Sequence, residues 1–288
     1  MLDNTLKTRT IAVLISLCLF FVGCSQQAKI DRLINKLQKG DKSARVMAVE
    51  KLGKIGGTSA IEALINVGFK SYDKDIQMKA IEALVKMEVP AIGSLINALG
   101  AENKDIQQNA MTALVGIGAP AVKPLITTLK NRDMQKNPRL STAVRVRAAL
   151  VLWKINKYHG SFDPLVTALK DSNPDTRIEA IRALAEIGNP LATGPLIAAM
   201  KDNDYSVKYE AGETLDKIVN SRSTAPLIAG LKDGDSDVRF TIKALLEKIG
   251  TPAVDHLITA LKDKNSYIRV GAASVLWSMK KDLRVVDT

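Results

Sequence analysis

The stretch PLIAGLKDGDSDVRFTIKALLEKIG, residues 226–250, decides the fold because its apolar residues fall at helical spacing in two separate runs. A first helix is predicted around Leu227 and Leu231, and a second between Val238 and Ile249. The polar segment KDGDSD separates the two runs and predicts a turn. The stretch is therefore a helix pair, and helices this short cannot bury their apolar sides alone.

The same pattern recurs along the chain with a period close to 31 residues. Residues 164–188 read PLVTALKDSNPDTRIEAIRALAEIG, and residues 256–280 read HLITALKDKNSYIRVGAASVLWSMK. The first leucine of each unit falls at Leu33, Leu64, Leu95, Leu125, Leu165, Leu196, Leu227 and Leu257. Successive leucines are separated by 31, 31, 30, 40, 31, 31 and 30 residues. Eight units therefore account for the chain from residue 30 onward, and stacking them would bury a continuous core.

The composition and the positions of glycines support an all-α protein. The chain is 46% hydrophobic but only 4% aromatic, so its apolar content is mostly Ala, Leu, Ile and Val, which favours closely packed helices. No stretch alternates with period two over enough residues to predict a sheet. Glycines follow the last apolar residue of several second helices, where a left-handed cap is expected: Gly56, Gly118, Gly188 and Gly250.

The units resemble HEAT repeats, specifically the short HEAT-like kind found in phycobilisome lyase subunits, through the pattern PLIxALKDxDxxVRxxAxxALxxIG. The resemblance implies an all-α, right-handed α-solenoid of eight HEAT-like helix pairs over residues 30–288, with an insertion in repeat 4. It also implies that second helices line the concave surface and that turn residues link neighbouring repeats. We therefore interpret one polar column as structural rather than as a phosphate-binding ladder: Arg45, Gln77, Gln107, Arg145, Arg177, Lys208, Arg239 and Arg269.

The first 29 residues follow a different pattern. Lys7 and Arg9 precede an uncharged apolar run over residues 11–23, which is shorter than the roughly 20 residues that a membrane span needs. This arrangement is typical of a secretory signal. The run ends in Val22, Gly23 and Cys24, which resemble the lipobox of bacterial lipoproteins, although Phe21 stands where Leu is usual.

The lipobox resemblance implies a signal peptide over residues 1–23 and a lipidated tether over residues 24–29, with Cys24 acylated. Cys18 would leave with the signal, so the mature chain would have no free thiol. We then expect the protein in the bacterial cell envelope, lipid-anchored in the outer membrane or on the outer face of the cytoplasmic membrane. An uncleaved anchor and a chance match are the alternatives.

The formal net charge of +11 is concentrated in the fourth unit. Its helices are separated by NRDMQKNPRLSTAV, residues 131–144, where other units have a six- to eight-residue turn. Between residues 130 and 157 there are eight basic residues and a single acidic one. The candidate contacts for an acidic protein partner or an anionic lipid are Arg132, Lys136, Arg139 and Arg147. The alternative is a solvated loop that lacks acidic residues.

The few aromatic residues occupy repeated positions. Trp153 and Trp277 share one position in units 4 and 8, and Tyr209 and Phe240 share another, early in the second helices of units 6 and 7. We predict Trp153, Tyr209 and Phe240 as partner-binding residues, because exposed aromatic anchors suit the capture of a peptide or protein. Packing in the core explains their positions equally well.

The sequence offers no catalytic or metal-binding constellation, and we expect no cofactor. His159 and His256 are 97 residues apart, and no HExxH motif, Walker loop or GxSxG motif occurs. Some HEAT-repeat hydroxylases bind iron through His-Glu pairs, but Gly160 and Leu257 follow the two histidines here. We therefore expect a membrane-tethered, non-catalytic scaffold that binds another protein or peptide, not nucleic acid. The alternatives are a nucleic-acid-binding HEAT-like protein and a HEAT-repeat enzyme of the lyase or hydroxylase kind.

Overall fold

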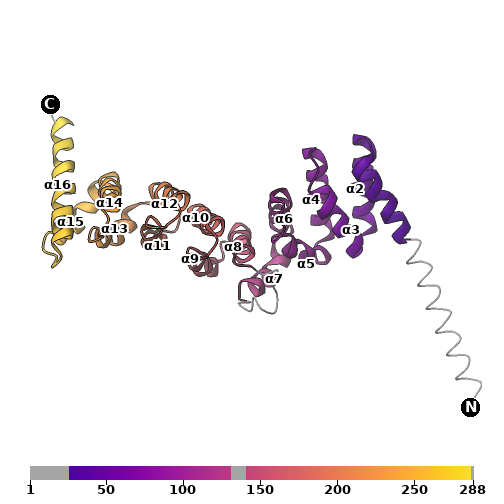
Figure 1. Ribbon diagram of the computed structural model, residues 1–288, viewed down its shortest axis with the longest axis horizontal. Coiled ribbons are helices and arrows are strands. Elements are labelled where there is room, and N and C mark those ends of the chain that lie inside the picture. The colour runs from indigo at the N-terminus through magenta and orange to yellow at the C-terminus, as the bar shows by residue number, and fades with distance from the viewer. Residues whose placement is uncertain (1–25, 131–140, 287–288) are drawn as a thin grey trace, which may run out of the picture. The chain divides into compact units, whose positions relative to one another are not determined.

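The computed structural model describes residues 26–130 and 141–286, with side chains described as far as residue 280. Helices joined by short turns account for these residues, and no strand occurs among them. The helices form eight consecutive pairs, which confirms the predicted all-α, α-solenoid class (Figure 1).

Each pair consists of a first helix, a turn and a second helix. Repeat 1 begins with a helical segment over residues 26–39. The first helices of repeats 2 to 8 are α3 (Gly57–Ala63), α5 (Val89–Ala98), α7 (Ala119–Lys130), α9 (Phe162–Ala168), α11 (Thr193–Ala199), α13 (Thr224–Gly230) and α15 (Val254–Ala260). Helix α3 continues directly into a π-helical turn, η1 (Leu64–Gly68). The second helices are α2 (Lys42–Ile55), α4 (Lys74–Met87), α6 (Lys104–Ile117), α8 (Thr142–Asn156), α10 (Pro174–Ile187), α12 (Tyr205–Ile218), α14 (Ser236–Ile249) and α16 (Ser266–Val286). Short 3₁₀ turns precede α9, α11, α13 and α15: η2 (His159–Ser161), η3 (Pro190–Ala192), η4 (Ser221–Ser223) and η5 (Thr251–Ala253).

Local signals in the sequence explain where the second helices begin and end. Seven of the eight second helices have an Asp or Asn N-cap whose side chain accepts a backbone N–H bond, as Asp204 does from Val207 at 3.1 Å, and Ser141 takes this place before α8. The four predicted cap glycines all have φ between 65° and 71°, but only Gly188 has the left-handed helical conformation that was predicted, because ψ lies between −161° and −129° at Gly56, Gly118 and Gly250. Glu88 and Lys157, which follow α4 and α8, also have positive φ, 51° and 55°, although neither is a glycine.

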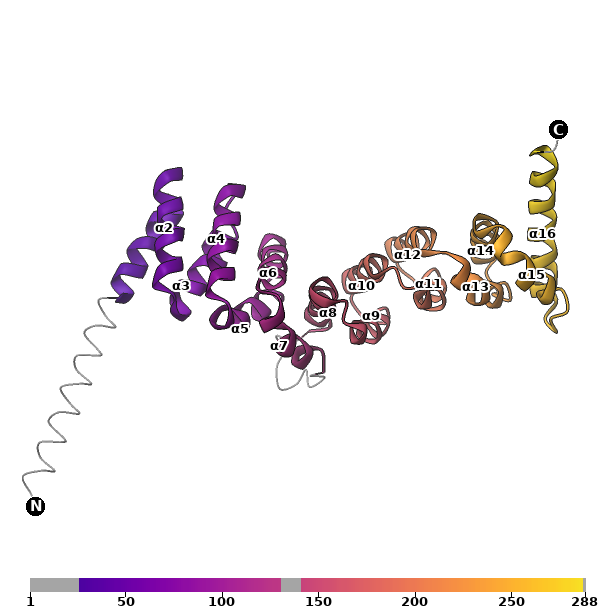
Figure 2. The same cartoon turned by 180° about the vertical axis from the view of Figure 1, so that it is seen from behind.

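Contacts divide the described chain into two compact units, whose border lies within α8: residues 1–144 with 154–156, and residues 145–153 with 157–288. In the first unit α2, α4 and α6 pack side by side, as do α3, α5 and α7 (Figure 2). In the second unit α10, α12, α14 and α16 form one row, and α11, α13 and α15 form the other. Helices of the same rank therefore pack together, as stacked repeats require.

The core of both units lies between the first and second helices. Seven of the eight repeated leucines are fully buried, and Leu33 of repeat 1 is half-buried. Phe69 is the one aromatic side chain among the large residues that are fully buried in the described chain. Small aliphatic side chains thus fill the interior, as the composition predicts, and most aromatic residues lie elsewhere.

Candidate functional site

The polar column near the start of the second helices is bonded to the turns. Arg177 donates from Nη1 to the carbonyl oxygen of Asp171 at 2.8 Å, and Gln107 donates from Nε2 to that of Ala101 at 2.5 Å. Equivalent bonds, each spanning six residues, join Gln77 to Ser71 (2.7 Å), Arg239 to Asp233 (2.6 Å) and Arg269 to Asp263 (2.8 Å). These column members are structural, as predicted, but their bonds brace their own turns, whereas the resemblance implied links between neighbouring repeats.

Ion pairs extend the bracing from one turn to the next in the second unit. Arg177 Nη2 lies 2.7 Å from Asp202 Oδ1, and Lys201 Nζ lies 2.8 Å from Asp233 Oδ2. Burial raises the pKa of Asp202, but hydrogen bonds from Arg177 and from a backbone N–H outweigh burial and hold the pKa below its usual value. The hydrogen bond from Lys201 is the main cause of a lowered pKa at Asp233. These carboxylates are therefore ionised and occupied by internal partners.

The insertion of repeat 4 falls only partly within the described residues. Arg132, Lys136 and Arg139 lie outside them, so their role as contacts stays a prediction. Arg147 lies on α8, where its side chain is 12% exposed and its Nη2 is 2.6 Å from Glu179 Oε1 on α10. The guanidinium of Arg147 is therefore held in an ion pair between two second helices, and its role as a contact for an acidic partner or an anionic lipid stays a prediction.

Trp153 is half-buried near the end of α8 and has two neighbours of its own. The Lys157 ammonium lies 5.0 Å from the centre of the Trp153 ring, and the His159 ring meets it edge-on at 6.3 Å. A cation over an indole face is a stabilising contact in itself. Trp153 is thus partly occupied within the chain, and the prediction that it contacts a partner stays untested.

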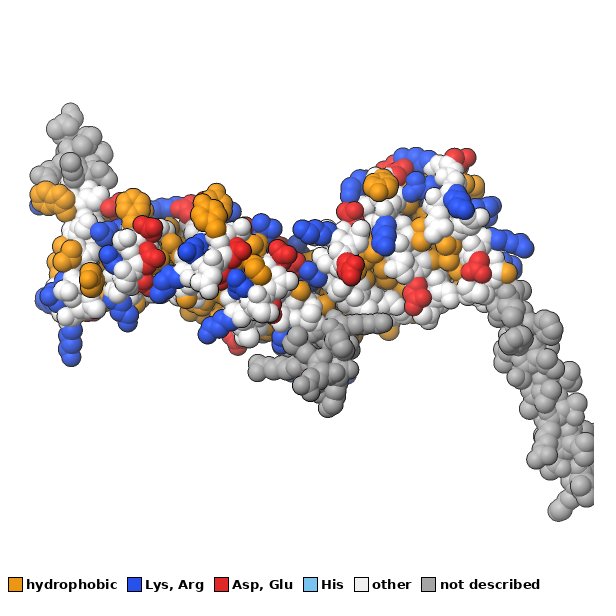
Figure 3. Space-filling view, in the orientation of Figure 1, with side chains coloured by type: hydrophobic (Ala, Val, Ile, Leu, Met, Phe, Trp, Pro, Cys, Tyr) orange, Lys and Arg blue, Asp and Glu red, His pale blue; other side chains and the backbone are white. Residues whose placement is uncertain are grey.

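Tyr209 and Phe240 are exposed, which rules out the alternative that they belong to the core. Both are the fifth residue of a second helix, and Val270 takes the same position in α16. We call these three residues, together with Tyr205 at the start of α12 and Tyr267 near the start of α16, the apolar row. Their exposed fractions lie between 57% and 78%. The space-filling view shows exposed hydrophobic side chains over α12 and α14 (Figure 3).

The apolar row contains a large share of the few aromatic residues in the chain. Four of the twelve aromatic residues in the chain belong to it, and all four are exposed rather than packed in the core. Tyr267 also accepts the Arg239 guanidinium over its ring at 5.1 Å, which connects α14 to α16. Sequence reasoning missed Tyr205, Tyr267 and Val270. The repeat alignment could have found Val270, because it continues the position of Tyr209 and Phe240.

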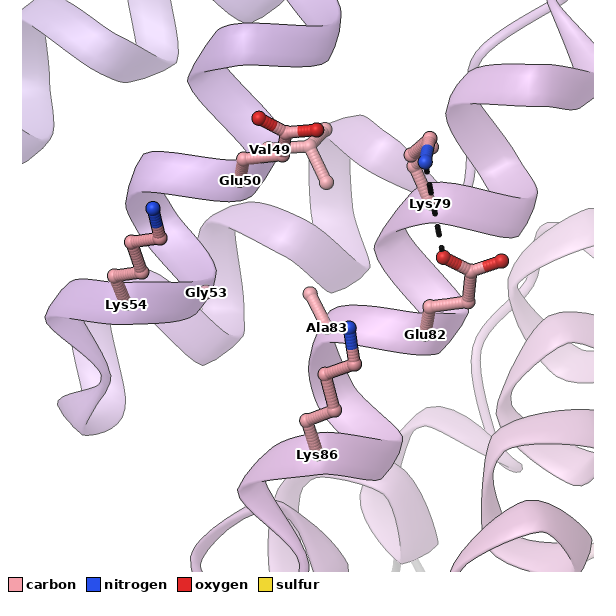
Figure 4. Close-up of a pocket in the computed structure, with 8 residues that line it drawn as sticks. All are labelled: Val49, Glu50, Gly53, Lys54, Lys79, Glu82, Ala83 and Lys86. Carbon is pink, nitrogen blue, oxygen red and sulfur yellow. Dashed lines mark ion pairs between the residues drawn. The ribbon is translucent and has the colours of Figure 1, made fainter.

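A hollow of about 400 Å³ lies between α2 and α4 in the first unit (Figure 4). Its lining residues are Val49, Glu50, Gly53, Lys54, Lys79, Glu82, Ala83 and Lys86. The two helices approach closely here, since a Cβ on Gly53 would lie 3.0 Å from that of Ala83. Lys79 and Glu82 form an exposed pair at 3.9 Å. The charged residues of the lining are lysines and glutamates.

Cys24 lies outside the described residues, so its predicted acylation stays a prediction. Within the described ranges no three His, Cys, Asp or Glu side chains are grouped so that they could hold a metal ion. No helix in the same ranges is long and apolar enough to cross a membrane.

The repeats identify the class of protein. A family model described as HEAT repeats matches residues 30–92, 137–215 and 193–277, which together cover well over half of the chain. The chain belongs to the HEAT repeat family. The comparison with curated proteins returned no match.

Solved structures with similar folds have low sequence identity to this chain. Human deoxyhypusine hydroxylase is 19% identical, with 90% of this chain and 98% of that chain covered and a TM-score of 0.31. The CpcE–CpcF complex of phycocyanin lyase from Nostoc sp. PCC7120 is 18% identical, with coverages of 87% and 94% and a TM-score of 0.32. The karyopherin Kap121p is 14% identical, with coverages of 86% and 32% and a TM-score of 0.44. At these values the similarities do not indicate what this chain binds or catalyses.

Proposed function

We propose that this HEAT-repeat protein is a non-catalytic scaffold that binds another protein or peptide and is tethered to a membrane of the bacterial cell envelope. The observation that carries the proposal is the apolar row on α12, α14 and α16. Single exposed apolar residues are common on protein surfaces, but an exposed set on neighbouring helices is a feature of binding sites.

The row has the properties of a set of binding anchors. Its aromatic side chains stand on helices that pack side by side, and packed helix axes are separated by about 8 to 10 Å. Anchors held on helices lose little conformational freedom when a partner binds. Tyrosine is among the residue types that contribute most to affinity at protein interfaces. A peptide or helix laid across α12, α14 and α16 would contact the row residues in turn.

Cations flank the row and favour an acidic partner. Lys208, Arg239 and Arg269 immediately precede Tyr209, Phe240 and Val270. The two arginines donate to backbone carbonyl oxygens, which are uncharged acceptors. Asp233 and Asp202 also attract Arg239 and Lys208, but their direct ion pairs are with Lys201 and Arg177. An acidic segment would therefore meet complementary charge beside the apolar anchors.

The tether is proposed from the sequence around Cys24. Several acyl chains on one residue would anchor the protein stably, whereas a single chain gives only marginal binding. The cations of the insertion, Arg132, Lys136 and Arg139, are proposed as a second contact for the same acidic partner. In this arrangement the helical repeats present the row and the lipid keeps it at the membrane.

The test is a pull-down from solubilised native envelope with residues 25–288, a chain that contains every described helix and the whole described core. The variant carries Tyr209→Ala and Phe240→Ala. A matched control carries Tyr72→Ala and Leu191→Ala, which remove two exposed apolar side chains away from the row. We expect the original chain and the control to capture the same envelope protein and the row variant to lose it. Equal capture by all three would exclude the row as the binding site.

Two further variants separate the other parts of the proposal. Replacing Arg132, Lys136 and Arg139 by Ser should weaken capture if the insertion contacts the same partner, and unchanged capture would remove it. In the full-length chain, Cys24→Ala should move the protein from the membrane fraction to the soluble fraction. A variant that stays in the membrane fraction would contradict the lipid tether.

A further inference from the structure

A second hollow lies at the first helix pair, on the part of the described chain that is nearest in sequence to Cys24. It has a volume of about 390 Å³. The helical segment over residues 26–39 contributes Lys29, Arg32, Leu33 and Lys36, and α2 contributes Lys51, Lys54 and Ile55. We call this feature the basic hollow, because five of its seven lining residues are cations and none is acidic.

The cations of the basic hollow are not neutralised within the described chain. No carboxylate there comes within ion-pairing distance of any of the five. Of the nearby acidic side chains, Asp31 accepts a hydrogen bond from Gln27 at 2.9 Å, and Asp41 caps α2. Attraction to the helix dipole accounts for a cation in the last turn of a helix, and it applies to Lys36 at the end of the segment over residues 26–39 and to Lys54 at the end of α2. It does not account for Lys29, Arg32 and Lys51.

The floor of the basic hollow is apolar. Leu33 and Ile55 are half-buried and lie among the cations. Leu33 is the one repeated leucine that is not fully buried, because no earlier repeat in the described chain packs against repeat 1. A cationic rim around an apolar floor is complementary to an amphiphilic anion, whose charged group meets the ammonium groups while its hydrocarbon covers the leucine and isoleucine.

The sequence places the basic hollow close to the proposed membrane anchor. Lys29 follows Cys24 by five residues, and five fully extended residues span at most about 18 Å. This length is an upper limit, so a lipid on Cys24 would let Lys29 come within one Debye length of the lipid headgroups, about 8 Å at physiological salt. Within that distance a cluster of cations is attracted to an anionic membrane surface.

We propose that the basic hollow binds the anionic headgroups of the membrane to which the protein is tethered. This inference rests on the proposed function only for the anchor at Cys24, and it goes beyond that function in assigning a lipid-binding site. The lipid chain and the basic hollow would act as two membrane signals, as in other proteins that combine an acyl chain with a basic cluster. The second signal fixes which side of repeat 1 faces the lipid, which a single-residue tether does not do.

The test uses residues 25–288 without any lipid, so binding reports the basic hollow and not the acyl chain. Vesicles of phosphatidylcholine, with and without phosphatidylglycerol, are mixed with the protein, and the bound fraction is measured by co-sedimentation. The hollow variant carries Lys36→Gln, Lys51→Gln and Lys54→Gln. The control carries Lys217→Gln, Lys232→Gln and Lys262→Gln, three exposed lysines of the second unit that give the same change in net charge.

We expect the original chain to bind only the vesicles that contain phosphatidylglycerol, and more weakly as salt is raised. Each cation near an anionic surface contributes about five-fold in affinity, so the hollow variant should bind roughly 100-fold more weakly. The control should stay within about two-fold of the original chain, because its lysines lie far from the hollow in sequence and belong to the other unit.

Three outcomes would overturn the proposal: no binding to anionic vesicles, an equal loss in both variants, or tighter binding to duplex DNA than to the vesicles at the same salt. Far-UV circular dichroism and thermal melting of both variants establish that they are folded. The row variant, with Tyr209→Ala and Phe240→Ala, should bind vesicles normally. Loss of partner capture and loss of vesicle binding therefore report separate sites.

Discussion

The turns of repeats 2 and 3 and those of repeats 5 to 8 solve the same structural problem with different chemistry. Gln77 and Gln107 brace the earlier turns through neutral amide groups. In repeats 5, 7 and 8 arginines make the same six-residue bond, and Arg177 also reaches the carboxylate of the next turn. The bond to the carbonyl is common to both groups. The positive charge of an arginine adds a second interaction where the neighbouring turn supplies a half-buried carboxylate, as Asp202 does for Arg177.

Links between turns differ in the same way. The pairs of Lys42 with Asp73 and Asp75, and of Lys74 with Asp105, involve lysines that are well exposed. Exposed pairs of this kind contribute little to stability. Arg177 and Asp202 have exposed fractions of 12% and 14%, so their pair is shielded from solvent. The second unit should therefore depend more on its ion pairs than the first unit does.

The largest loss of stability should come from truncating buried leucines, and it should be the same in both units. The two units differ in their turns, but the same kind of aliphatic core fills both. Leu95→Ala and Leu227→Ala each remove a fully buried side chain of the repeated column. Each should lower the free energy of unfolding by about 3 kcal/mol, measured by urea denaturation followed by circular dichroism. The exposed substitution Leu191→Ala serves as the control and should change stability by less than about 0.5 kcal/mol. A much smaller loss at one of the two buried sites would show that the cores are not equivalent.

The second effect should distinguish the two kinds of brace. Arg177→Gln can keep the carbonyl bond but leaves Asp202 without its partner, and should lower the free energy of unfolding by about 2 kcal/mol. Gln107→Ala removes only a neutral hydrogen bond and should cost about 1 kcal/mol. A double-mutant cycle of Arg177→Gln with Asp202→Asn isolates the energy of the pair. A coupling energy near zero would contradict the role assigned to the charge.

The third effect is a fall in the free energy of unfolding at acid pH, which should come from the charged turns. The folded-state pKa values of Asp202 and Asp233 are lowered, so these carboxylates stabilise the fold when ionised. That stabilisation is complete above the unfolded-state pKa of about 3.9 and is lost as pH falls through the lower folded-state pKa. Unfolding measured from about pH 5 downward should therefore show falling stability. Asp202→Asn with Asp233→Asn should flatten the curve, and Gln107→Ala should leave its shape unchanged.

The smallest effect concerns a position that both units share. Glu88 has φ of 51° where four other repeats have a glycine at the end of the second helix. Glu88→Gly should raise the free energy of unfolding by up to about 1 kcal/mol, because glycine adopts this region without steric strain. Gly118→Ala should lower it by a similar amount. A lower free energy of unfolding for Glu88→Gly would contradict this prediction. It would show that contacts of the Glu88 side chain stabilise the fold by more than the backbone strain destabilises it.

Most of the fold could be predicted from the sequence, because the repeat supplies the same information eight times. Apolar spacing located the helix pairs, and the cap glycines marked the ends of second helices. Where a cap glycine was missing, Glu88 and Lys157 still ended their helices with a positive φ, whereas Val219 ended α12 with φ of −64°. Packing of neighbouring repeats therefore overrides the local preference of a single residue.

The candidate sites could be predicted only in part. Repeat alignment identified Tyr209 and Phe240, but spacing alone could not show whether they face solvent or the core. Arg147 was selected for its charge, and its partner Glu179 lies 32 residues away, on the next second helix. Local charge pointed to repeat 4 rather than to the basic hollow, although residues 26–56 carry eight cations against three carboxylates. The helical spacing of Lys29, Arg32 and Lys36 was the available signal.

The sequence by itself determined the helix pairs, their number and their turns, because these depend on local spacing, caps and the repetition of one pattern. Tertiary structure alone decided which polar and aromatic side chains are occupied and which are available. Arg147 is held by Glu179, whereas Tyr209 and Phe240 remain exposed. The physical reason is that availability depends on what the neighbouring repeat places opposite a side chain, and this is set by packing between helices that are about 30 residues apart in the chain.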